Sequence, residues 1–178
     1  MTALTGQGLG PPLVAALCAV LVAVAGGLAT TTDAWYRRLR VPAWKPPDWA
    51  FGPVWAAIFA CTATSGVLAW NAAPDAGARG LLIAAFSVNA VLNIAWSVLF
   101  FRFRRPDWAL AEVAVLWLSI AVLMLVTGRT LLAAGLLNLP YLAWVSVAAC
   151  LNLRIVRLNP RRGGRAGRGA DGGTCEGA

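Results

Sequence analysis

The sequence predicts an all-α membrane protein whose five transmembrane helices form one bundle. Its 178 residues are 60% hydrophobic and only 12% charged, a composition outside the range of ordinary soluble domains. Apolar runs recur at close to the roughly 20 residues that a helix needs to cross a bilayer. Polar connections separate these runs, and the length suits a single domain.

The predicted spans set the domain organisation. They cover residues 13–31, 51–71, 80–101, 108–127 and 130–153. Together they form a transmembrane domain at 13–153, after an extracytoplasmic segment at 1–12. The tail at 154–178 is rich in Arg and Gly without an apolar period, so we expect it to be disordered.

Two spans carry further signals. The first repeats a small residue at every fourth position, at Ala15, Ala19, Ala23 and Gly27. This stripe suits close packing against a neighbouring helix, although the abundance of alanine explains it equally well. In the fifth span, Pro140 cannot donate a backbone hydrogen bond, so we expect a bend there.

The connections contain helix signals as well. The longest, residues 33–49, begins with Asp33, a suitable N-cap for a short helix through Arg40. We expect this Trp- and Pro-rich loop to act as a lid over the bundle. Asp107 is the expected cap of the fourth span, and a turn at 128–129 is expected before the fifth.

The basic residues predict the orientation in the membrane. Of 15 Lys and Arg, all but Arg79 and Arg129 lie in the first connection, the third connection or the tail. The positive-inside rule therefore places the C-terminus in the cytoplasm and the N-terminus outside. Topology explains the net charge of +8 better than nucleic-acid binding does. The Ala-, Arg- and Gly-rich composition suggests an integral protein of a bacterial cell membrane.

Several kinds of chemistry are excluded by composition. The sequence contains no histidine, which removes His-ligated haem and most metal sites. Its four cysteines form no CxxC pair, so we expect no metal site. Glu112 is about one turn inside its span, and no acidic residue lies at mid-membrane depth, which disfavours ion-coupled transport. We therefore expect no required cofactor.

Tryptophan and asparagine remain as candidate site residues. Of nine Trp, those at span ends suit an aromatic belt, but Trp55 and Trp144 lie well inside their spans. With a rise of about 1.5 Å per residue, both lie roughly as deep as Asn93, measured from the predicted cytoplasmic face. Asn89 shares a helix side with Asn93. We predict a pocket beneath the lid, while ordinary packing and interhelical hydrogen bonding remain the alternatives for each residue.

Four ordered motifs resemble those of a known family. The first is Trp44-x-Pro46-Pro47-x-Trp49-x-Phe51-x-Pro53-Val54-Trp55, preceded by Trp35-Tyr36. The others are Asn89-x-x-x-Asn93-x-x-Trp96-Ser97 and Pro140-Tyr141-x-x-Trp144. These motifs are similar to those of the tryptophan-rich sensory protein and translocator protein family, over about residues 11–160.

The resemblance implies a homodimer of five-helix chains that bind porphyrins and, in some members, sterols. The sterol motif needs a Tyr that residues 151–157 lack. The family's pocket positions fall on Tyr36, Trp55, Asn93 and Trp144. The full set of expected ligand-binding residues is Tyr36, Trp49, Trp55, Asn89, Asn93, Trp96, Tyr141 and Trp144. The basic residues Arg37, Arg38, Arg40 and Lys45 could meet the ligand's propionates, or could serve topology alone.

Three functions remain open at this point. The first is a sensor of porphyrins that regulates a tetrapyrrole or stress response. The second is an enzyme that degrades porphyrin in light, for which the sequence shows no acid–base pair, so oxidisable Trp55 and Trp144 would be the catalytic candidates. The third is a carrier for porphyrin or lipid.

Overall fold

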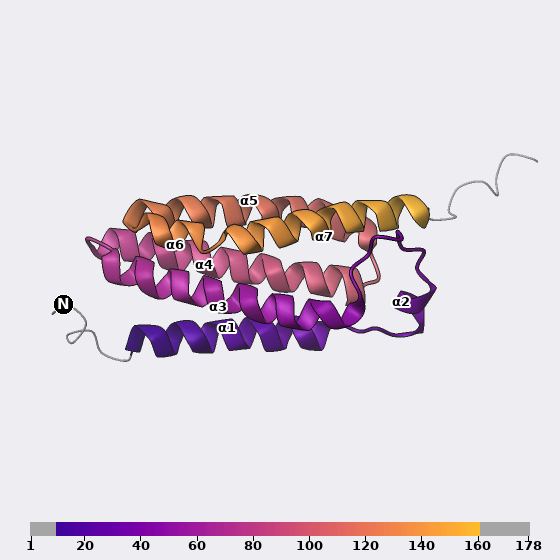
Figure 1. Ribbon diagram of the computed structural model, residues 1–178, viewed down its shortest axis with the longest axis horizontal. Helices are drawn as coiled ribbons and strands as arrows, with labels where there is room; N and C mark the ends of the chain where they lie inside the picture. Colours follow the sequence, from indigo (N-terminus) through magenta and orange to yellow (C-terminus); the bar gives the residue numbers. More distant parts are fainter. Residues whose placement is uncertain (1–9, 161–178) are drawn as a thin grey trace, which may run out of the picture.

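The computed structural model describes residues 10–160, and every regular element in that range is helical. Long helices lie side by side in an elongated bundle (Figure 1). The elements are α1 (Gly10–Ala29), α2 (Ala34–Arg38), α3 (Asp48–Ala72), α4 (Ala76–Ser97), the π-helix η1 (Val98–Arg102), α5 (Pro106–Thr130), α6 (Leu132–Leu136) and α7 (Leu139–Leu158). Residues 1–9 of the predicted N-terminal segment 1–12 and residues 161–178 of the predicted tail 154–178 lie outside the described residues. The first part of that tail is not disordered as expected, because α7 continues to Leu158.

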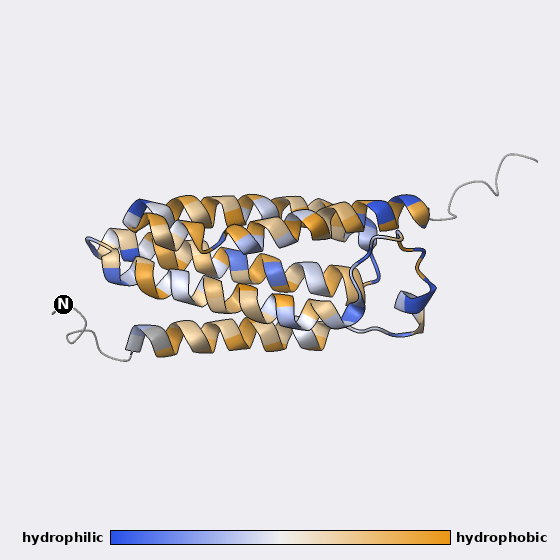
Figure 2. Ribbon diagram, in the orientation of Figure 1, coloured by the Kyte–Doolittle hydropathy of each residue, from blue (hydrophilic) through white to orange (hydrophobic). Residues whose placement is uncertain are grey.

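The helices confirm an integral membrane protein. Four segments are long and apolar enough to cross a bilayer: Asp48–Ala72, Ala76–Arg102, Pro106–Thr130 and Leu132–Leu158. The apolar stretch of α1, Leu13–Ala29, is shorter. Hydrophobic residues cover the length of the bundle, while hydrophilic residues gather at its ends (Figure 2). Exposed apolar side chains along α1 and α5 would be unfavourable in water but face hydrocarbon in a bilayer.

Helix α5, the predicted fourth span, packs against α4 on one side and α7 on the other. Val113, Leu116, Ile120 and Leu123 are at most 2% exposed and follow one another at three- or four-residue spacing, as one face of a helix requires. The first three of them meet Ile58 of α3 and the α7 residues Tyr141 and Val145 in the central apolar cluster. This core fixes α3, α4, α5 and α7 around the candidate site.

At the predicted bend near Pro140, the helix is interrupted for two residues, Leu137 and Asn138. Between α6 and α7, Asn138 is fully buried, and its Nδ2 donates to the Ser65 hydroxyl at 2.8 Å and to the Ala134 carbonyl at 3.2 Å. Pro140 lies in the first turn of α7, where a residue without an N–H costs nothing. The amide of Asn138 thus stabilises the interruption and ties it to α3.

The predicted turn at residues 128–129 is wrong. Helix α5 continues to Thr130, and Leu131 alone separates it from α6. So tight a reversal brings two backbones together: a Cβ added to Gly135 would lie 2.8 Å from the Met124 carbonyl oxygen and 2.9 Å from the Gly128 Cα. Glycine at position 135 is therefore a packing requirement.

Of the two N-caps predicted in the polar connections, Asp33 is confirmed and Asp107 is not. Asp33 caps α2 by accepting from the Tyr36 N–H at 3.1 Å, which confirms the short helix, although it ends at Arg38 and not at Arg40. Asp107 is not a cap. Because α5 begins at Pro106, Asp107 falls in its first turn and forms a salt bridge with Arg105 at 2.9 Å.

Candidate ligand-binding pocket

The predicted lid, residues 33–49, corresponds to the segment 30–47 between α1 and α3, because α3 already begins at Asp48. We call this segment the lid, and it lies over one end of the bundle (Figure 1). One hydrogen-bonded group holds it to α3. The Tyr36 hydroxyl donates to Asp48 Oδ1 at 3.1 Å, the Lys45 ammonium pairs with the same carboxylate, and its Nζ lies 5.4 Å from the centre of the Tyr36 ring. Partial burial of Tyr36 raises the pKa of its phenol, so the hydroxyl remains a donor at neutral pH.

Two further contacts fasten the lid to distant parts of the chain. Arg104 Nη2 lies 2.7 Å from Asp33 Oδ2, and Arg104 adopts a φ of 52°, an uncommon conformation for a residue with a side chain. On the other side, the Arg40 N–H donates to Asn159 Oδ1 at 3.0 Å while Asn159 Nδ2 donates to the Arg40 carbonyl at 2.9 Å. The lid is thereby anchored next to η1 and at the end of α7.

Replacing Asp33 with Asn tests the first anchor. Asparagine keeps the helix cap but removes the ion pair with Arg104, so we expect trypsin to cleave within the lid about two to five times faster, as for a surface ion pair. The Tyr36 N–H and Arg104 lower the pKa of Asp33 below its ordinary 3.8. The anchor is therefore complete above that pH and is lost as the pH falls through the lowered pKa.

The matched control for this prediction is Asp75→Asn. Asp75 caps α4 by accepting from Ala78 N–H at 2.7 Å and lies away from the lid. Cleavage of the Asp33 variant at the wild-type rate would show that the Arg104 contact does not restrain the lid.

Beneath the lid lies a cavity of about 430 Å³, within the size range of small-molecule pockets. We call it the lid pocket. Aromatic rings that contact one another form much of its wall: Phe51 and Trp144 meet edge to face at 5.4 Å, and Trp55 stacks on Phe59 at 5.3 Å. A flat apolar ligand would find indole and phenyl surfaces on more than one side.

Five of the eight predicted ligand-binding residues line the lid pocket: Tyr36, Trp55, Asn93, Trp96 and Trp144. Asn89 and Tyr141 line a second, larger cavity, in whose wall Asn93 also takes part. Trp49 lines neither cavity and is 76% exposed. Asp48 precedes it and does line the lid pocket. Successive helical residues point about 100° apart, so the helix that turns Asp48 inward turns Trp49 outward.

The four predicted basic contacts do not line the lid pocket. Lys45 is occupied by Asp48, and the backbone of Arg40 is bound to Asn159. Arg37 and Arg38 are exposed in the last turn of α2.

The asparagines also connect helices. Asn89 Nδ2 donates to the Ser119 hydroxyl of α5, and Asn93 Nδ2 donates to the Tyr141 hydroxyl of α7, both at 2.9 Å. Trp117 also lies well inside its predicted span, and a contact between helices accounts for it: its Nε1 donates to the Ser146 hydroxyl at 2.9 Å. The structural alternative therefore applies to Asn89 and Trp117, whereas Asn93 combines a helix contact with a place in the pocket wall.

Sequence reasoning missed several residues of the lid pocket. Phe51 and Phe59 lie four residues before and after the predicted Trp55 on α3, a spacing that would have placed both on the same helix face as Trp55. Asp48 and Phe101 were missed as well. Nothing local in the sequence marks Phe101, which reaches the pocket through its contact with Tyr36, with ring centres 5.7 Å apart.

The chain is similar in sequence to known membrane proteins. The model of the TspO/MBR family matches residues 14–158. The chain is 38% identical to the tryptophan-rich protein TspO of Chlorobaculum tepidum over 155 residues, which are 83% of this chain and 97% of that protein. It is 34% identical to the tryptophan-rich sensory protein of Cereibacter sphaeroides, covering 83% and 94%. It is 33% identical to the translocator protein of Sus scrofa, covering 87% and 96%.

Proposed function

The chain belongs to the TspO/MBR family, and from this premise we propose that it is a membrane receptor that binds porphyrins in the lid pocket. The observation that carries the proposal is the set of aromatic rings around this cavity, above all Trp55, Trp96 and Trp144. A tetrapyrrole is a flat aromatic macrocycle, and each stacking contact contributes about 0.5–1.5 kcal/mol beyond burial. The function would be regulatory, in a tetrapyrrole or stress response.

The lid supplies a means to recognise the ligand's acidic groups. Arg37 and Arg38 are exposed on α2, and Lys45 lies beside the pocket residues Tyr36 and Asp48. Charge-assisted hydrogen bonds from these side chains to propionates would hold the macrocycle with its acidic edge toward water. The apolar part would lie against the indoles below.

Protoporphyrin and haem distinguish this proposal from metal-centred binding. Because the sequence contains no histidine, we expect metal-free protoporphyrin to bind about as tightly as haem, with both quenching Trp fluorescence in the purified protein. Absence of saturable quenching by either would reject the receptor function. Much tighter haem binding would point to iron ligation by Cys or Tyr.

We further propose that α1 is the fifth membrane span and that the lid faces the cytoplasm. Helix α1 has 20 residues and packs along α3 and α4, and it runs beside the other helices over much of the bundle (Figure 1). The basic residues concentrate at the lid end, as the positive-inside rule requires of a cytoplasmic face. The resemblance to the family also leads us to propose a homodimer.

Reporter fusions test the topology. We expect a fusion after Ala178 to report the cytoplasm and one at Ala76, at the opposite end of the bundle, to report the outside, because almost all basic residues lie near the first end. The readout is a pair of reporters, one active only inside and one only outside. Signals from the same side for both fusions would contradict five spans.

The presence of Trp55 and Trp144 together in the pocket wall keeps light-dependent porphyrin degradation as a second candidate. Indole is oxidisable, and a bound porphyrin would itself absorb the light. Loss of porphyrin absorbance only under illumination would favour this enzyme. Ligand flux into liposomes would favour a carrier.

A further inference from the structure

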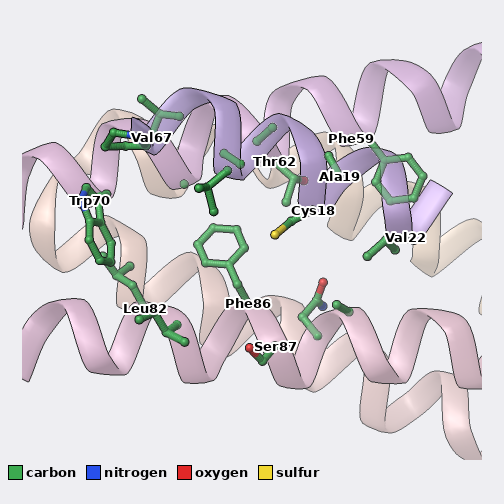
Figure 3. A pocket seen from close by; sticks show the side chains of 18 of the residues that line it. Cys18, Ala19, Val22, Phe59, Thr62, Val67, Trp70, Leu82, Phe86 and Ser87 are labelled. Carbon is green, nitrogen blue, oxygen red and sulfur yellow. The ribbon is translucent and has the colours of Figure 1, made fainter. Parts of the chain in front are cut away.

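The larger of the two cavities lies away from the lid and shares only Val22, Phe59 and Asn93 with the lid pocket. Its volume is about 710 Å³. It is enclosed by α1, α3 and α4, and Cys18 of α1 and Phe86 of α4 point into the same space from opposite sides (Figure 3). We call it the intramembrane cavity.

Small side chains account for the space. Ala15 and Ala19 of α1 and Ala63 and Gly66 of α3 all line it, and such short side chains leave the space between the helices unfilled. The Phe86 ring closes one wall, since a Cβ added to Gly66 would lie 3.3 Å from Phe86 Cζ. The small-residue stripe of α1 therefore lines cavities, where the sequence suggested close helix contact.

The chemistry of the lining selects an apolar occupant. None of the 20 residues that line the intramembrane cavity is charged. Its few polar groups include Asn89 and Asn93, whose amide nitrogens already bind hydroxyls on other helices. A charged ligand would lose its hydration without compensation here. A hydrocarbon chain has no such hydration to lose.

The shape and position of the cavity narrow the occupant further. Its walls extend from Pro11 to Val22 on α1 and from Phe59 to Trp70 on α3, about 17 Å along each helix at the usual rise. The long axis is thus parallel to the helices, as acyl chains are in a bilayer. Val14 and Ile83 both line the cavity and are more than half exposed, so it opens between α1 and α4 at the depth of lipid tails.

We propose that the intramembrane cavity binds one acyl chain of a bilayer phospholipid, which enters between α1 and α4. The inner end of the chain would reach Val22 and Phe59, which also line the lid pocket. Phe59 stacks on Trp55, so the bound chain supports an aromatic wall of the porphyrin site from behind. The proposal itself does not depend on which ligand the lid pocket takes.

The test fills the cavity and compares lipid retention. Protein purified in detergent is incubated with dimyristoyl phosphatidylcholine, and bound lipid is counted by native mass spectrometry. Ala19→Phe inserts a ring into the cavity, whereas Ala16→Phe places the same ring on the exposed side of the same helix. We expect one lipid per chain in the wild type and in Ala16→Phe, and at least tenfold lower occupancy in Ala19→Phe.

Thermal unfolding in the same detergent separates loss of binding from misfolding. A ring that fills the empty cavity should leave the Tm of the lipid-free Ala19→Phe protein equal to that of the wild type or higher. Added phosphatidylcholine should raise the Tm of the wild type, because it binds the folded state, but not that of Ala19→Phe. Should Ala19→Phe fail to fold, Ala15→Leu, a smaller filling one turn earlier, replaces it.

Three outcomes would overturn the proposal. One is equal lipid retention by Ala19→Phe and Ala16→Phe. Another is cross-linking from a phosphatidylcholine that carries a photoactivatable group at the chain end, if adducts form only on outward residues such as Leu17 and Val20 and not on Val22 or Phe59. The last is a dimer whose formation, and not lipid binding, is lost in Ala19→Phe, which would assign the cavity to a second copy of the chain.

Discussion

Replacing Gly135 with alanine is expected to destabilise the protein by about 1–3 kcal/mol, the usual range for an extra group forced into a packed interior. The added Cβ would lie 2.8 Å from the Met124 carbonyl oxygen and 2.9 Å from the Gly128 Cα. Both are backbone atoms of α5, so neither can rotate away as a side chain would. Unfolding in mixed micelles with increasing dodecyl sulfate gives the change in free energy.

Gly80→Ala is the matched control for this substitution. Gly80 lies within α4, and a Cβ there would meet nothing within 4 Å. Alanine is the better helix former by about 1 kcal/mol, so the control should be neutral or slightly stabilising. An equal response of the two variants would mean that the close approach of α5 and α6 does not contribute to stability.

Replacing Trp144 has the largest effect that we expect on ligand binding. If Trp144 stacks on a porphyrin, Trp144→Phe retains much of the packing against Phe51 but weakens stacking, which costs about 1 kcal/mol or roughly fivefold in affinity. Trp144→Ala removes the whole half-buried aromatic side chain, and losses of roughly thirtyfold are usual for aromatic residues that anchor a partner. Fluorescence titration with protoporphyrin measures both variants.

The control for Trp144 is Trp108→Phe. Trp108 is 55% exposed, lies 4.1 Å from the Arg105 guanidinium and lines neither cavity. Its replacement should leave the affinity unchanged. If Trp144→Phe and Trp55→Phe also bind as the wild type does, the lid pocket is not the porphyrin site.

The same variants separate a receptor from a light-dependent enzyme. Phenylalanine is much harder to oxidise than indole, so an enzyme that uses these tryptophans should lose degradation more steeply than binding in both Phe variants. The rate under illumination is compared at saturating protoporphyrin. Retained degradation with weakened binding would leave Trp55 and Trp144 as walls of the pocket only.

The class of the protein, its approximate helices and the depth of the candidate residues could all be predicted from the amino-acid sequence. Hydrophobic runs report membrane segments because a bilayer accepts little else. The constant rise of a helix converts position into depth, and on this basis Trp55, Asn93 and Trp144 were placed together, as they are in the lid pocket. The cap at Asp33 was equally local, because it needs only the next three residues.

The direction in which each side chain faces, and the distant groups that it meets, depend on how the helices pack. Depth does not give rotation about a helix axis, so Trp49 was expected in the pocket although Asp48 takes that place. The depth of a residue also does not show that Asp33 pairs with Arg104, or that Arg40 is held by Asn159. The division of the interior into two cavities arises in the same way. It depends on how α1 packs against α3 and α4, and contacts between residues far apart in the chain, which no short pattern encodes, determine that packing.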